Sequence, residues 1–165
     1  MNVFWAYFWP PIAAGLILGI VAGAIAFRRR RWRVVALAVG VLVAIGLSAL
    51  WHGPVGAADR YSAAVERSVR ETIVYWDIPQ VSGHLHHGPL TRTILLSGPA
   101  DEFQRSELVR IIGDVPGVES ATWSRSGGVP LIVEGATAAI LGFLLGLLVA
   151  YLRELRRRYN AHWNW

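Results

Sequence analysis

The chain has 165 residues, of which 54% are hydrophobic and only 16% are charged, so its apolar content exceeds what one soluble core needs and favours a membrane protein. Cysteine is absent, which excludes a disulfide framework, a thiolate metal site and a cysteine nucleophile. The net charge of +5 could suggest nucleic-acid binding, but the positions of the charges argue against that class of partner.

The basic residues are all arginine, and most of the excess lies beside long apolar runs. Residues 59–125, by contrast, hold seven arginines and nine acidic residues, so their net charge is −2. Anionic lipid headgroups attract arginines that flank spanning segments, so we expect membrane lipids as partners and no nucleic acid. The arginines assigned to topology and to headgroup contact are Arg28, Arg29, Arg30, Arg31, Arg33, Arg153, Arg156, Arg157 and Arg158.

Residues 4–27 are uncharged and mostly apolar, and about 20 such residues cross a bilayer core, so they predict a first transmembrane helix. Aromatic residues open this run, as is typical of a membrane interface. Pro10 and Pro11 are compatible with a first helical turn. A cleavable signal peptide is the alternative, but its positive charge would precede the apolar run, whereas here the charge follows it.

Residues 34–51 form a second apolar run, so residues 1–52 predict a transmembrane hairpin closed by the arginine turn at 28–33. Because arginine-rich turns stay in the cytoplasm, the N-terminus and the chain from residue 53 onward are expected on the other side. We therefore interpret the middle of the chain as an extracytoplasmic domain.

That domain, residues 53–128, is polar, and its apolar spacing alternates between two periods. Helical spacing covers about 59–76 and 101–114, whereas 79–98 favours two short strands and 118–123 a third. The expected order is helix, strand, strand, helix, strand. The predicted fold class is therefore a membrane α-helical protein with three spanning helices and a small α+β domain outside the cytoplasm.

Two motifs within about 60–124 carry a resemblance to a known family. They are Ile94-Leu95-Leu96-Ser97-Gly98 and, after a charged helix, Val115-Pro116-Gly117-Val118-Glu119-Ser120-Ala121. This stretch resembles the BON domain, an αββαβ module of bacterial envelope proteins. The resemblance implies a periplasmic domain of a bacterial inner-membrane protein. It also implies binding of phospholipid or peptidoglycan, or envelope maintenance, without catalysis. Gly98 and Gly117 are expected at element ends, where unusual backbone angles cost glycine little.

Residues 129–152 form a third apolar run, and residues 129–165 complete the chain with an arginine-rich tail expected in the cytoplasm. The run carries one charge, Glu134, and an ionisable group inside a spanning segment is a functional hypothesis. At this shallow depth it could reach the headgroups instead. Its possible partners are His52 or an arginine of a neighbouring subunit.

Small residues recur every fourth position in two of the three apolar runs and predict close helix packing. Whether the partner helix lies in the same chain or in another is left open by the sequence. The residues are Gly15, Gly19, Gly23, Ala138, Gly142 and Gly146.

Three histidines in the domain, His84, His86 and His87, are weak candidates for a metal site or a proton sensor. A solvated polar loop is the preferred interpretation, because no carboxylate or cysteine stands near them in sequence. We expect neither a metal nor a cofactor. Nucleophile elbows, Walker loops and dinucleotide fingerprints are absent from the sequence, so we expect no enzyme.

The leading functional hypothesis is a non-catalytic accessory subunit that docks its glycine faces on a larger integral-membrane complex and presents its domain for assembly or partner docking. The alternative is a free-standing envelope-stress protein that binds phospholipid or peptidoglycan through the BON-like domain.

Overall fold

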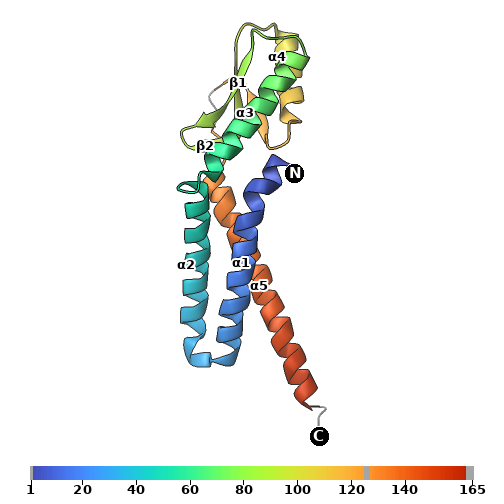
Figure 1. Ribbon diagram of the computed structural model, residues 1–165. Helices are drawn as coiled ribbons and strands as arrows, with labels where there is room; N and C mark the ends of the chain where they lie inside the picture. The colour runs from blue at the N-terminus through green and yellow to red at the C-terminus, as the bar shows by residue number, and fades with distance from the viewer. Residues whose placement is uncertain (1, 125–126, 163–165) are drawn as a thin grey trace. The chain divides into compact units, whose positions relative to one another are not determined.

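The computed structural model describes residues 2–124 and 127–162, which are mostly helical (Figure 1). In chain order the elements are α1 (Val3–Arg28), a 3-10 turn η1 (Arg30–Trp32), α2 (Arg33–His52), α3 (Ala57–Tyr75), β1 (Ser82–His87), β2 (Leu90–Ser97), α4 (Glu102–Gly113), β3 (Ser120–Thr122) and α5 (Leu131–His162). Within the described ranges three helices are long and apolar enough to cross a membrane, as predicted: Val3–Arg28, Arg30–His52 and Leu131–Asn160.

The chain divides into two compact units. The mixed unit comprises Met1–Tyr7 and Gly56–Glu134, and the helical unit comprises Phe8–Val55 and Gly135–Trp165. The first residues of α1 and α5 thus belong to the mixed unit, although their apolar pattern assigns them to the membrane segments. Burial of Tyr7 and Leu131 is the physical reason for this difference.

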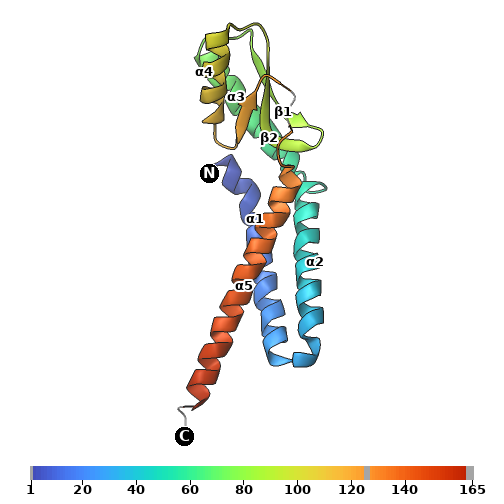
Figure 2. The same cartoon turned by 180° about the vertical axis from the view of Figure 1, so that it is seen from behind.

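The mixed unit contains a three-stranded sheet in the order β1-β2-β3, in the part of the chain that the structure describes. Strands β1 and β2 pair antiparallel, with Leu85 opposite Ile94, whereas β2 and β3 pair parallel. Helix α3 packs on β1 and α4 packs on β3. Figure 1 shows α3 crossing one face of the sheet, and Figure 2, from behind, shows the strands in front of it.

The core of the mixed unit follows from one stripe on α3. Its buried residues recur every fourth position, which places them on one helical face. Buried apolar side chains of the sheet and of α4 complete the core. The core residues are Tyr61, Val65, Val69, Ile73, Leu85, Ile94, Leu96, Leu108 and Ile112.

Gly98 directly follows β2, as expected, whereas Gly117 lies in the turn between α4 and β3, and both adopt the unusual backbone angles that the sequence predicts for them. Their φ angles are +132° and +101°, a region in which side chains other than glycine are strained. A Cβ atom on Gly98 would also collide with the carbonyl oxygen of Gln80. Both positions therefore require glycine.

Two boundaries differ from the sequence expectation. Helix α1 begins at Val3, so Pro10 and Pro11 lie inside it and not in its first turn. Prolines are tolerated inside spanning helices, where neighbouring helices satisfy the freed backbone groups. Helix α5 begins after Pro130 and runs on past Leu152 to His162, because arginine, leucine and glutamate are strong helix formers and Glu154 pairs with Arg158 one turn later.

Candidate functional site

Several side chains of the mixed unit gather around Arg92 on β2. Its guanidinium Nη1 donates to Oε2 of Glu134 at 3.0 Å, and the two side chains are only 19% and 18% exposed. Its Nε donates to the carbonyl oxygen of Gly117 at 3.3 Å. One side chain thus joins β2, the loop before β3 and the first turn of α5.

Tyr61 on α3 shares this carbonyl. Its hydroxyl donates to the oxygen of Gly117 at 2.5 Å. Burial raises the pKa of Tyr61 to about 12, although the nearby positive charge of Arg92 opposes that shift. The phenol is therefore neutral at physiological pH and remains a hydrogen-bond donor.

The N-terminal residues complete the group. The ring of Phe4 lies 5.1 Å from the guanidinium carbon of Arg92, within the range of a cation–π contact. The ring of Tyr7 lies 5.4 Å from that of Tyr61, centroid to centroid, and its hydroxyl donates to the carbonyl oxygen of Leu131 at 3.5 Å. We call Phe4, Tyr7, Tyr61, Arg92, Gly117 and Glu134 the Arg92 cluster.

The structure pairs Glu134 with Arg92 of the same chain. Burial alone lowers the pKa of Arg92, but the hydrogen bond to Glu134 and the charge of Glu134 raise it above its ordinary value. A permanently charged, paired guanidinium suits a structural tie between three segments better than acid–base chemistry. The sequence gives little sign of this pair, because 42 residues separate its members.

The glycine faces predicted for the first and third apolar runs pack against each other within the helical unit. A Cβ atom on Gly15 would collide with the carbonyl oxygen of Ala139, and one on Gly19 with that of Phe143. On the opposite helix, Gly146 would collide with the carbonyl oxygen of Leu16. Residue numbers rise together along both helices, so α1 and α5 run parallel and in close backbone contact.

The remaining predicted residues of the two faces differ in how closely they pack. A Cβ atom on Gly142 would collide with the carbonyl oxygen of Ile12, and one on Gly23 would lie 2.6 Å from the Cβ of Ala150. Ala138, however, is only half-buried, whereas Ala139 is fully buried. The strict four-residue repeat predicts the wrong alanine, because 3.6 residues per turn bring position 139 back onto the face of Gly142 and Gly146.

Helix α2 adds a small-residue face that the sequence reasoning missed. Its buried residues are Gly40, Ala44 and Ser48, one every fourth position. A Cβ atom on Gly40 would lie 2.7 Å from the ring of Phe143, whereas Gly46 faces open space. The sequence signal for this face was the recurrence of a small residue, glycine, alanine or serine, at every fourth position.

The three histidines do not converge. His84 is exposed, His86 Nδ1 lies 3.1 Å from the carbonyl oxygen of Pro89, and His87 Nε2 lies 3.1 Å from Oε1 of Glu66. Glu66, on α3, is a carboxylate that sequence proximity could not reveal. Across residues 2–124 and 127–162, no group of three or more histidine or acidic side chains is placed to hold a metal ion.

The two arginine clusters lie together in the helical unit. Arg28 shares the lining of a 460 Å³ pocket with Arg153, Arg156 and Arg157. A second pocket, of 450 Å³, is lined by Arg30, Arg33 and Arg158 among others. Both clusters therefore occupy one end of the three-helix arrangement, as parallel α1 and α5 require.

No family model, curated protein or solved structure matches the chain. The chain's own side chains offer a half-buried ion pair, close-packed glycine faces, a basic helix end and, at the end of α3, an exposed aromatic surface.

Proposed function

We propose that the protein is a non-catalytic accessory subunit of a larger bacterial inner-membrane complex. The arginine clusters support an orientation with the N-terminus and the mixed unit outside the cytoplasm and the turn and tail inside it. The mixed unit, in the BON-like arrangement that the sequence suggests, would present a surface to a partner protein.

The observation that carries this proposal is the aromatic end of α3. Tyr75 is 83% exposed, Trp76 is 50% exposed, and the neighbouring Val74 is exposed as well. The two rings contact each other edge to face, 6.0 Å between centroids. Exposed tyrosine and tryptophan side chains that stand together are enriched in protein interfaces.

The backbone holds this surface in place. Asp77 adopts φ +55°, Ile78 N–H donates to the carbonyl oxygen of Ile73 at 3.3 Å, and Asp77 N–H donates to that of Val74 at 3.0 Å. These are the two hydrogen bonds of a Schellman helix end, which fixes the last turn. An ordered aromatic surface binds at a lower entropic cost than a loose one.

The docking surface proposed here differs from the one that the sequence suggests. The glycines of α1 and α5 contact each other, so their faces are already covered within the chain. The aromatic end of α3, by contrast, has no cover in the part of the chain that the structure describes.

Purification of the full-length chain in a mild detergent tests the proposal. We expect it to migrate with a larger complex of defined composition, identified by mass spectrometry. The double substitution Tyr75→Ala and Trp76→Ala should release the complex, because it removes both exposed rings. Phe103→Ala, at an exposed aromatic position on α4, is the control and should retain it. Migration of the native chain alone in every mild detergent would contradict the proposal.

A second candidate rests on the observed order of elements, α3-β1-β2-α4-β3, and on the glycine turns at Gly98 and Gly117. Both suit the BON resemblance, which implies an envelope-stress protein that binds phospholipid or peptidoglycan. Two results together would favour this candidate over the first. The full-length protein would bind purified cell-wall sacculi and lose that binding on substitution in the mixed unit, and the native chain would migrate alone in mild detergent.

A further inference from the structure

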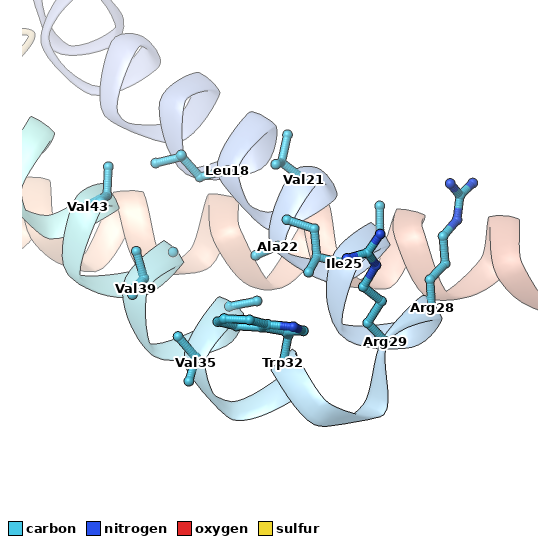
Figure 3. A pocket seen from close by; sticks show the side chains of 13 residues that line it. Leu18, Val21, Ala22, Ile25, Arg28, Arg29, Trp32, Val35, Val39 and Val43 are labelled. Carbon is cyan, nitrogen blue, oxygen red and sulfur yellow. The ribbon is translucent and has the colours of Figure 1, made fainter.

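The hairpin of α1 and α2 contains an apolar groove that the proposed function does not use. Its volume is about 610 Å³, and its lining comes from both helices (Figure 3). Ligand sites in proteins commonly fall between about 300 and 1,000 Å³. The groove lies wholly within the helical unit.

The walls of the groove are apolar and open. Val21 and Ile25 line it from α1, and Val35, Val39 and Val43 line it from α2. All five are exposed, so the chain leaves this surface without cover. In a bilayer such a surface is covered by apolar groups, which belong either to a lipid acyl chain or to another helix.

One end of the groove is polar and positive. Figure 3 shows Trp32 at the turn between the helices, with Arg28 and Arg29 at the same end. No ion pair involves Arg28 or Arg29 within residues 2–124 and 127–162. The neighbouring arginine clusters contain nine arginines and one acid, Glu154, which is already bonded to Arg158 at 3.1 Å. An anionic group at this end therefore meets uncompensated positive charge.

We propose that the groove binds an anionic phospholipid, with an acyl chain between α1 and α2 and the phosphate held by Arg28 and Arg29. Charge complementarity selects this occupant, because a partner helix would satisfy the apolar walls but leave the two guanidinium groups unpaired. Guanidinium groups form strong, charge-assisted hydrogen bonds to phosphate oxygens, and tryptophan favours the headgroup level. A zwitterionic lipid carries its own cation and gains less there.

Quenching of Trp32 fluorescence by bromine tests the site directly. The full-length protein is placed in nanodiscs that contain a small fraction of phosphatidylglycerol brominated on its acyl chains, or of equally brominated phosphatidylcholine. The contribution of Trp32 is the difference between the native protein and Trp32→Phe. We expect Trp32 to be quenched at about tenfold lower phosphatidylglycerol than phosphatidylcholine, since each juxtamembrane arginine favours anionic lipid.

Two matched pairs of variants separate the site from general attraction. Arg28→Gln with Arg29→Gln should abolish the preference, whereas Arg156→Gln with Arg157→Gln removes the same charge outside the groove and should preserve it. Val39→Phe fills the groove and should prevent quenching, whereas Leu42→Phe, at an exposed α2 position outside the groove, should not.

Equal quenching by both lipids, or equal loss in both arginine variants, would overturn the proposal. A different result would also overturn it: two copies of the chain in each nanodisc, together with quenching that Val39→Phe does not change. The groove would then hold the hairpin of a second copy.

Discussion

Gly146→Leu is expected to break the packing of α1 against α5 and to destabilise the helical unit more than any other single substitution considered. A side chain at this position would meet the carbonyl oxygen of Leu16, the amide nitrogen of Ile20 at 2.8 Å and the Cα of Gly19 at 3.0 Å. All three are backbone atoms, which cannot rotate away as a side chain can. Overpacking typically costs about 1–3 kcal/mol and sometimes more, and here the two helices must separate, so we expect about 3 kcal/mol or more.

Gly46→Leu provides the matched control, because Gly46 has open space where its Cβ would lie. Thermal unfolding of both variants in the same detergent measures the difference. We expect a clear loss of stability for Gly146→Leu and almost none for Gly46→Leu. Equal stability of the two variants would show that the glycine faces do not pack against each other.

Arg92→Met should destabilise the mixed unit by about 2–3 kcal/mol, since it leaves the carboxylate of Glu134 without its partner in a half-buried site. Loss of one member of a fully buried pair costs about 3–5 kcal/mol, and exposed pairs contribute about 0–1 kcal/mol. The Arg92–Glu134 pair lies between these limits. Arg92→Met combined with Glu134→Leu should recover most of the loss, because no charge is then left unpaired.

The exposed pair Arg110–Glu107 is the control, with side chains 65% and 39% exposed and a 2.7 Å separation. Arg110→Met should change the free energy of unfolding by well under about 1 kcal/mol. Denaturant unfolding in detergent of the native chain, Arg92→Met, Glu134→Leu and the double variant gives a double-mutant cycle for Arg92 and Glu134. A coupling energy close to zero would refute the role of the pair as a tie between β2 and α5.

The elements themselves are largely readable from the sequence. Spanning helices depend on long apolar runs, and α3 depends on a four-residue apolar repeat, so both leave local signals. Ser97-Gly98 marks the end of β2, and the capping box of Asp101 and Gln104 marks the start of α4.

The contacts between distant segments are not readable in the same way. Nothing local in the sequence links Arg92 to Glu134 or Phe4, because these pairings arise only when β2 meets the first turns of α1 and α5. The choice between Ala138 and Ala139 depends on the rotation of α5 about its axis, which its packing against α1 sets. Likewise, only the packing of α2 separates its buried Gly40 from its outward Gly46.

Cysteine labelling tests most directly the central claim, that the arginine clusters hold the turn and tail in the cytoplasm and the mixed unit outside it. Because the chain has no cysteine, one can be placed at Phe103, exposed on α4, or at Asn160, exposed near the end of α5. In intact cells a membrane-impermeant maleimide should label Phe103→Cys at once and Asn160→Cys only after the membrane is opened. Labelling of Asn160→Cys in intact cells, with Phe103→Cys protected, would contradict the account.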